Sequence, residues 1–230
     1  TIDGTNDTPT VSDVAVSVLE TDFAGMSNLV YTSTTSLIAS DVDATDTYTF
    51  AKSNFAGTTG EVGLQVSLVQ SDALFMQAYN AAKLGSPVAF TALKAAFLDL
   101  ISTSAIAAIV GASNTLSTLT ADITAASDFA TLINVINANS ALSLSATTTS
   151  VTVTAEATAA QTATLEAIGA INITVNTDGT YSLSTPLVNN LAEGEVAIIT
   201  FGYTATDNSG TATATSDVKT VSLTVTGTND

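Results

Sequence analysis

The side chains whose types and spacing could do chemistry in this 230-residue chain are acidic and amide groups. The phrase Gly-Thr-Asn-Asp stands at residues 4–7 and returns at residues 227–230, while Asp41, Asp43 and Asp46 lie close together in a short segment. Carboxylates this close repel one another unless they are solvated or bound to a cation. Calcium prefers carboxylate and carbonyl oxygens. Both patterns therefore predict calcium ligation, with a plain turn and a solvated acidic loop as the alternatives.

The composition excludes several classes of site and partner. The chain has no His, Cys or Arg and only four Lys, and its formal net charge is −17. It therefore has neither a zinc site of the usual kind nor a His-based triad. Nucleic acids and anionic membranes need a basic surface, so neither is expected as a partner. Paired carboxylates can hydrolyse glycosides, but here they gather in loops that calcium explains, so we expect no enzyme activity.

The longest uncharged apolar stretch, residues 100–121, contains serine, threonine, glycine and asparagine. A membrane span requires a sustained apolar run. We therefore expect buried helix and turn here, and no membrane insertion. The abundance of Thr, Ser, Ala and Asp without Cys is typical of secreted bacterial repeat proteins, which predicts an extracellular or cell-surface location.

The returning Gly-Thr-Asn-Asp phrase indicates one unit of a tandem array, because self-similarity is the mark of repeat architectures. Neighbouring repeats of the same chain are then the expected partners, and an isolated unit is expected to be a monomer.

Period-two alternation of β-branched residues predicts strands in both outer parts of the chain. Asp178-Gly179 predicts a hairpin turn between two of them. The segment 155–167 is ambiguous between helix and strand. The predicted strands cover residues 10–20, 29–38, 47–50, 63–69, 142–144, 151–153, 171–175, 181–183, 198–206 and 221–225.

The middle of the chain has a helical pattern instead. Phe90, Leu93, Phe97 and Ile101 follow one another at helical spacing and form one apolar face. Pro87 suits the first turn of that helix, and Asp128 suits the N-cap of a later one. The expected organisation is a β-sandwich made from residues 1–70 and 140–230, with a helical insertion subdomain at 71–139.

The order of the short motifs resembles the VCBS-type repeats of giant bacterial RTX adhesins, which are cadherin-like domains. The resemblance covers about residues 1–65 and 171–230, and the helical middle has no counterpart in it. The incoming linker departs from the cadherin pattern, because Asp3 lies one residue too far from Asn6-Asp7 and Thr8 replaces an asparagine. The motifs are Leu-Glu-Thr-Asp at 19–22, Ser-Asp-Val-Asp at 40–43, Asp-Gly-Thr-Tyr at 178–181, Leu-Ala-Glu-Gly-Glu at 191–195, Ala-Thr-Asp-Asn-Ser-Gly at 205–210 and the closing phrase at 227–230.

The resemblance implies a mainly β chain, a cadherin-like Greek-key sandwich with an Ala-rich α-helical insertion. It also implies Ca²⁺ at both ends of the sandwich, each site completed by a neighbouring repeat. At the incoming end the implied ligands are Asn6, Asp7, Asp41, Asp43 and Asp207. At the outgoing end they are Glu20, Glu195, Asn229 and Asp230, with Asp46 and Glu193 as weaker candidates.

The function expected from these features is that of a calcium-rigidified extender or interaction module in a secreted adhesin, acting in cell adhesion and biofilm formation. One alternative is a ligand-binding domain whose helical insertion takes a glycan, a peptide or a cell surface, with aromatic side chains lining a groove. Aromatic residues at helical spacing are more often core. A subunit of an S-layer-type surface array is the second alternative.

Overall fold

The computed structural model describes residues 5–23, 30–43, 45–55, 62–103, 106–111, 116–191, 193 and 195–228. The fold is mixed α/β, with 34% helix and 34% strand. The prediction of a mainly β chain is therefore only partly confirmed, because the helical content equals the strand content.

The largest sheet has the strand order β2-β12-β11-β6-β8-β7, and β5 also pairs with β11. Strand β11 has 13 residues and changes partner along its length: Glu195–Phe201 pair with β6, and Gly202–Asp207 pair with β5. A Cβ at Gly202 would lie 2.4 Å from the carbonyl oxygen of Ser53, so only glycine fits at this change of partner. The strands are β2 (Val14–Leu19), β5 (Tyr48–Ser53), β6 (Val62–Gln70), β7 (Leu142–Ala146), β8 (Val151–Glu156), β11 (Glu195–Asp207) and β12 (Lys219–Thr226).

Two smaller sheets complete the β part. The order β3-β10-β9 joins Val30–Thr32, Tyr181–Ser184 and Asn172–Val175, and a two-residue ladder joins β1 (Thr10–Val11) to β4 (Ala39–Ser40). The strand predicted over residues 29–38 is thus broken. Its later part leaves the ladder because the Leu37 N–H donates to the carbonyl of Gly179 at the hairpin turn. Gly179 has a φ of 82°, as the predicted turn between β9 and β10 requires.

The three-stranded sheet packs on the largest sheet through aromatic rings. The rings of Tyr181 on β10 and Phe201 on β11 meet edge to face across the two sheets, with centroids 5.4 Å apart. The rings of Phe50 and Tyr203, 6.5 Å apart, lie on the neighbouring strands β5 and β11 of the largest sheet itself. Such pairs add to the free energy that burial of their area supplies. Alternate residues of β11 and β12 point into this core, which explains the period-two pattern in the sequence.

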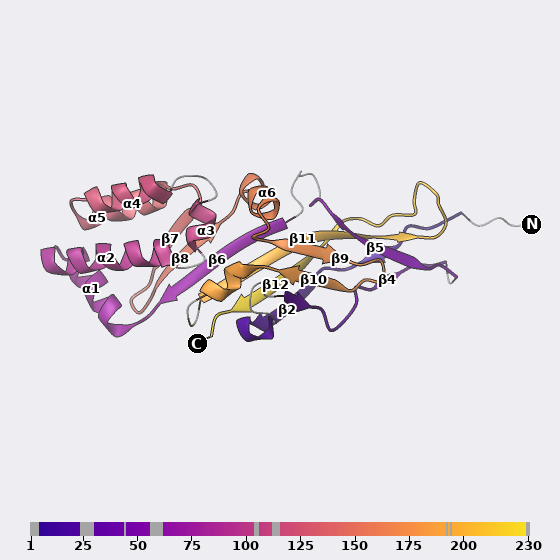
Figure 1. The fold of residues 1–230 in the computed structure, drawn as a ribbon, viewed down its shortest axis with the longest axis horizontal. Coiled ribbons are helices and arrows are strands. Elements are labelled where there is room, and N and C mark those ends of the chain that lie inside the picture. Colours follow the sequence, from indigo (N-terminus) through magenta and orange to yellow (C-terminus); the bar gives the residue numbers. More distant parts are fainter. Residues whose placement is uncertain are drawn as a thin grey trace, which may run out of the picture.

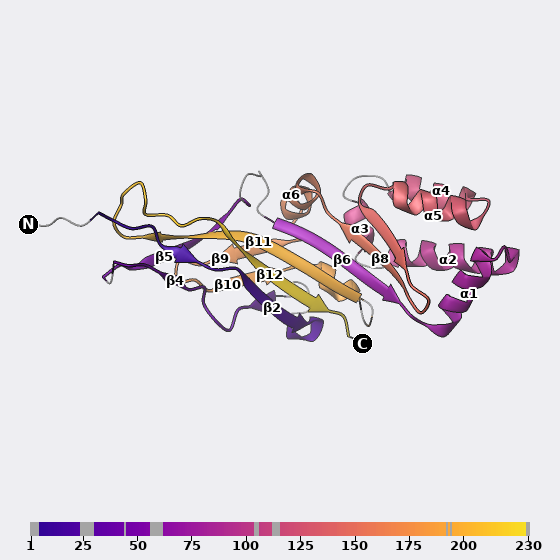
Figure 2. The ribbon, with the colours of Figure 1, turned by 180° about the vertical axis from the view of Figure 1, so that it is seen from behind.

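Helices α1 to α5 gather beside β7 and β8, at the end of the molecule opposite the N-terminal segment, whereas α6 lies nearer the middle, against β6 (Figure 1). The view from behind shows the same arrangement, with the C-terminus between the helices and the N-terminal end (Figure 2). None of the helices in the described residues is long and apolar enough to cross a membrane. The helices are α1 (Ala73–Lys83), α2 (Pro87–Thr103), α3 (Ile106–Gly111), α4 (Leu116–Ala125), α5 (Phe129–Ala138) and α6 (Ala159–Ala167), with single 3₁₀ turns η1 (Glu20–Asp22) and η2 (Pro186–Asn190).

The helical part has its own apolar contacts. Leu93, Phe97 and Ile101 are buried on one face of α2, as the spacing predicts, and the Phe97 ring meets Phe75 of α1 edge to face. Helix α5 contacts β7 and α3 contacts β8, so this group of helices packs on the sheet rather than standing apart from it. The predicted division at residues 71–139 remains a prediction.

Candidate metal centres at the two ends of the longest strand

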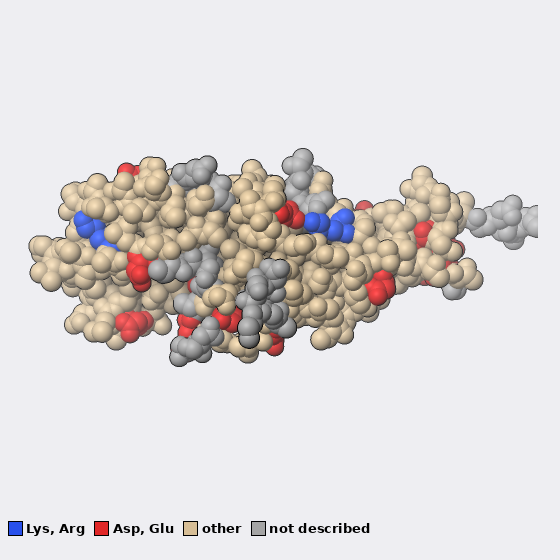
Figure 3. Space-filling view, in the orientation of Figure 1, with Lys and Arg blue, Asp and Glu red and all other residues tan. Residues whose placement is uncertain are grey.

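Strand β11 positions the two candidate sites, because Glu195 begins it and Asp207 ends it. Thirteen residues of strand span roughly 40 Å. The end at Asp207 receives the first described residues of the chain and is called the incoming end. The end at Glu195 adjoins the last described residues and is called the outgoing end. Figure 3 shows the molecule in the orientation of Figure 1. On the face that it shows, acidic side chains lie at the N-terminal end and around the middle, and basic side chains are seen in two places.

Three carboxylates meet at the incoming end. Asp41 follows β4, Asp46 precedes β5, and Asp207 closes β11. Each offers one oxygen, and these three oxygens all lie within 4.8 Å of one another. We call this group the incoming cluster. The pairing of Asp207 with Tyr48 sets its position, because it fixes the end of β11 beside the start of β5.

Local turns orient the carboxylates of the incoming cluster. One oxygen of Asp41 accepts hydrogen bonds from the backbone N–H groups of Val42 and Asp43, at 2.6 and 3.3 Å. One oxygen of Asp207 accepts from the backbone N–H of Ser209 at 2.7 Å. Asp and Asn side chains commonly close turns in this way. Each carboxylate thereby keeps its second oxygen for another partner.

The second oxygens of Asp41 and Asp46 are the feature that points to a cation. Both Oδ2 atoms are buried, and neither has a hydrogen-bond partner among the described residues. A buried carboxylate oxygen without a partner is costly. Burial, followed by the charges of Asp207, Asp43 and Asp41, raises the pKa of Asp46. The pKa of Asp207 is lowered instead, with its hydrogen bonds from Ser209 as the largest cause.

The incoming chain segment is tied to the incoming cluster. The Asn6 side-chain amide donates to the second oxygen of Asp207 at 3.1 Å, and the Asp7 N–H donates to Asp43 at 3.1 Å. The hydroxyl of Thr213 also donates to the carbonyl of Asn6 at 3.2 Å. Of the five ligands expected at this end, only Asp41 and Asp207 belong to the incoming cluster, while Asn6, Asp7 and Asp43 lie beside it through the hydrogen bonds just described. Asp43 adjoins the group of three through Asp46, whose N–H donates to the Asp43 carbonyl at 3.1 Å.

The outgoing end brings two buried glutamates to one chain segment. Glu20 is 6% exposed and Glu195 is 0% exposed. The Glu20 carboxylate accepts from the N–H of Thr228 at 3.1 Å, and the Glu195 carbonyl accepts from the N–H of Gly227 at 2.8 Å. The parallel pairing of β2 with β12 places these groups at the same end. The Thr228 hydroxyl oxygen is buried and has no partner in the described part of the chain.

Some of the expected ligands cannot be placed. Asn229 and Asp230 lie outside the described residues, and Glu193 is exposed between two residues that are also outside them. Asp46, a weaker candidate from the sequence, belongs to the incoming cluster itself. No local signal in the sequence places Asp46 there, because its position in the cluster depends on the pairing of β5 with the end of β11.

The incoming cluster fits a hard divalent cation. Three converging carboxylates, two of them with buried oxygens that lack partners among the described residues, are the donor set that calcium takes. The chain has no His and no Cys, so the imidazole and thiolate ligands that favour zinc and copper are missing. The residues that would hold the ion are Asp41, Asp46 and Asp207, with Asp43 beside them.

Comparisons of the chain with protein-family models, curated proteins and solved structures found no match in any of the three. The function therefore has to be argued from the residues and their geometry.

Proposed function

We propose that this chain is a calcium-stiffened repeat module of a secreted bacterial cell-surface adhesin, acting in adhesion and biofilm formation. Calcium at the incoming cluster fixes the direction from which the preceding repeat joins. The observation that carries the proposal is the pair of buried Oδ2 atoms on Asp41 and Asp46, which lack partners within the described residues, beside a linker that Asn6 and Asp7 tie to the same loops.

The strand pairings support a cadherin-like Greek-key sandwich as the frame. The first long strand, β2, lies parallel to the last, β12, and β12-β11-β5 form one face while β3-β10-β9 form the other. Helices α1–α5 with β6, β7 and β8 then form a lateral insertion between β5 and β9. The order of strands along the chain and the packed rings of Tyr181 and Phe201 agree with this frame.

Calcium would supply positive charge and six to eight coordination positions at the incoming cluster when bound. Without calcium, burial and then the neighbouring carboxylates disfavour the charged form of Asp46, and both raise its pKa. The chain's own residues orient the cluster through the turns at Asp41 and Asp207. The large apolar core lies away from these loops, so calcium should stiffen the joint rather than create the fold.

The alternative of a ligand groove on the helical insertion has less support. Tyr79 and Phe97 are 5% and 1% exposed, and the ring of Tyr79 packs edge to face against Phe129. The rings of Tyr79 and Phe97 belong to the core of the helical part and are not available to a glycan or a peptide, and Phe75 and Phe90 are half-buried against that core.

A protein made of two copies of the chain in tandem tests the proposal by small-angle scattering and calorimetry, with calcium and with chelator. Calcium should bind and should lengthen and straighten the particle. Replacing Asp41, Asp43 and Asp46 by Ala should remove most of that response. Asp122→Ala with Asp217→Ala is the matched control, because both side chains are exposed acids outside the incoming cluster.

An unchanged particle shape and no bound calcium in the tandem protein would reject the proposal. A calcium response that survives replacement of the three aspartates would also count against it, because the ion would then bind elsewhere.

A further inference from the structure

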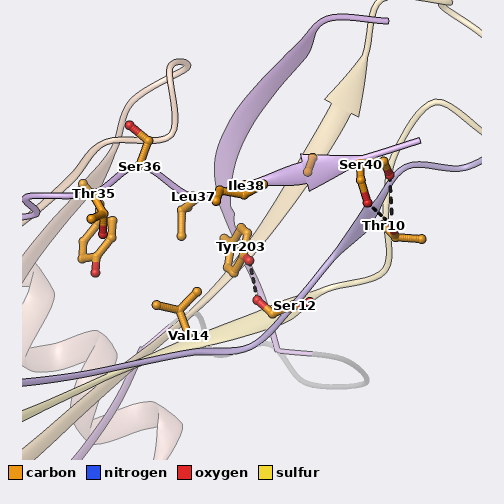
Figure 4. A pocket seen from close by; sticks show the side chains of 11 residues that line it. Thr10, Ser12, Val14, Thr35, Ser36, Leu37, Ile38, Ser40 and Tyr203 are labelled. Atoms are coloured by element: carbon orange, nitrogen blue, oxygen red, sulfur yellow. Dashed lines mark hydrogen bonds between the residues drawn. The ribbon is translucent and has the colours of Figure 1, made fainter. Parts of the chain in front are cut away.

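A large uncharged cavity of the sandwich has no role in the proposed calcium sites. Its volume is about 530 Å³. One wall runs from β1 to the first residue of β2, the other covers residues 35–40, and the rings of Tyr181 and Tyr203 complete the lining. This volume is in the range of pockets that hold small ligands or side chains. Figure 4 shows Val14, Leu37 and Tyr203 converging on the space between two extended chain segments.

The cavity lies where a strand ladder opens. Residues 10–11 pair with residues 39–40, and the pairing stops after Val11 and Ala39. Beyond that point the two segments separate around the cavity. A hydrogen bond from the Tyr203 hydroxyl to the Ser12 carbonyl holds one wall in place, and the hydroxyls of Thr10 and Ser40 join the walls at the closed end.

Within the described residues, both walls have main-chain groups without a hydrogen-bond partner. Strand β2 is the last strand of its sheet and pairs with β12 along one edge only. On the facing wall, the backbone N–H and C=O groups of Thr35 and Ser36 make no hydrogen bond within the described residues. Unpaired strand edges are templates for another extended chain.

The lining contains no charged side chain, although the net charge of the chain is −17. The ring of Tyr181 stays neutral as well, because burial, followed by Tyr31 and Tyr203, raises its pKa to about 12. An anionic occupant would be repelled by the surrounding charge, and a cationic one would find no carboxylate in the wall. The walls are therefore suited to an uncharged occupant.

We propose that this cavity is a recognition site for an extended, uncharged peptide segment of a partner protein. The main chain of the segment pairs with the open edge of β2 and with Thr35–Ser36, and one apolar side chain enters the space between Val14, Leu37 and Tyr203. Strand addition of this kind takes affinity from main-chain hydrogen bonds and specificity from pockets for alternate side chains. The site does not depend on calcium.

The test uses the whole chain and the probe peptide acetyl-Thr-Val-Trp-Val-Thr-amide. The protein has no Trp, so tryptophan emission reports on the peptide alone. Binding should give a saturable blue shift of that emission. A second peptide with N-methyl groups on both Val residues keeps the side chains and removes two N–H donors, and it should bind about thirtyfold more weakly.

Two protein variants locate the site. Thr35→Phe places a ring in the cavity and should weaken binding about tenfold. Thr34→Phe is the matched control, because Thr34 is the exposed neighbour that does not line the cavity. The affinity of this variant for the probe peptide should equal that of the unchanged protein. Equal melting temperatures of the two variants would show that both are folded.

Three results would overturn the proposal. One is an absence of binding at millimolar peptide. Another is equal binding of the N-methylated peptide, which would mean that only apolar contact holds it. The third is a different occupant: displacement of the probe by maltotriose would assign the cavity to a neutral sugar, and a dimer in sedimentation that the probe dissociates would assign it to a second copy.

Discussion

Asp46 is the residue at which the electrostatics of the incoming cluster are most unfavourable. Its carboxylate has a buried oxygen without a partner in the described residues. Burial, followed by the charges of three other aspartates, raises its pKa. A raised pKa means that the folded state disfavours the charged form. This residue therefore reduces stability at neutral pH in the absence of a cation, and the loss is relieved by protonation or by a bound cation.

Asp46→Asn should raise the melting temperature in chelator, because it removes one of several like charges. The same variant should lose most of the increase in melting temperature that calcium gives to the unchanged protein. Thermal unfolding with calcium and with chelator measures both effects. Asp122→Asn, an exposed aspartate on α4, should change neither. A lower melting temperature of Asp46→Asn in chelator would contradict the assignment of mutual repulsion.

Asp128 shows the opposite shift. Its side chain accepts a hydrogen bond from the Thr131 N–H at the start of α5, and that bond is the largest cause of its lowered pKa. A lowered pKa gives stability that is present above the ordinary value of 3.8 and is lost as pH falls through the folded value. Asp128→Ala should therefore destabilise the protein at neutral pH, and the difference should shrink at about pH 3.

Urea unfolding of both proteins at several pH values measures this dependence. The prediction fails if the gap between Asp128→Ala and the unchanged protein stays constant from neutral pH to the acid range.

The sequence could identify a residue as a strong candidate for calcium ligation only where the residue stood in a recognisable motif. Asp41 and Asp43 stand in a short acidic motif, and the structure brings both to the end where Asn6 and Asp7 lie. Asp46 could not be ranked as high, because its place in the cluster depends on the pairing of β5 with the end of β11. That pairing joins residues far apart along the chain, and no local pattern encodes it.

At the scale of elements, helix α2 shows how far an apolar stripe predicts packing. Phe97 is 1% exposed and meets Phe75 edge to face, so its ring fills space between α1 and α2. Phe97→Ala should lower the free energy of unfolding by about 3–5 kcal/mol, from lost burial and the cavity left behind. Denaturant unfolding measures the change.

Leu84→Ala is the control for that measurement, because Leu84 is 89% exposed at the end of α1. Its free energy of unfolding should stay within about 0.5 kcal/mol of the unchanged value. A comparable loss in both variants would show that burial is not the cause.

Helix α6 is an element that the periodicity of apolar residues did not predict. Residues 155–167 are ambiguous in sequence, and the chain there ends β8 at Glu156 and begins a helix at Ala159. Thr158 and Gln161 decide the change, because each side chain bonds the other's backbone N–H in a capping box. Thr158→Ala should therefore cost about 1 kcal/mol of stability in denaturant unfolding, whereas Thr158→Ser, which keeps the hydroxyl, should cost clearly less.

For the whole molecule, the sequence predicted strands at both ends and helices between them, and the described residues have that order. It did not predict that the helical content would equal the strand content, nor that β6, β8 and β7 would extend the largest sheet toward the helices. Sheet order depends on contacts between distant residues, which a single sequence does not display. Alternation of apolar and polar residues predicts which face of a strand is buried, but it does not predict which strands pair with one another.

The final prediction concerns where calcium acts in the molecule. The incoming cluster lies at one end of β11, while helices α1, α2, α4 and α5 lie toward the opposite end of the molecule (Figure 1). The core between them consists of buried apolar side chains that need no cation. Calcium should therefore slow amide hydrogen exchange in the loops of the incoming end, which cover residues 5–10, 41–47 and 206–214, and should leave α2 unchanged.

Hydrogen exchange followed by mass spectrometry, with calcium and with chelator, measures this distribution. Asp41→Ala with Asp46→Ala should abolish the protection in all three segments together, because one ion bridges loops that are far apart in sequence. Global protection that includes α2 would mean that calcium stabilises the entire fold, and the ion would then be a folding cofactor rather than a joint stiffener. Protection of a single loop would indicate ordinary local binding of a cation to an acidic turn.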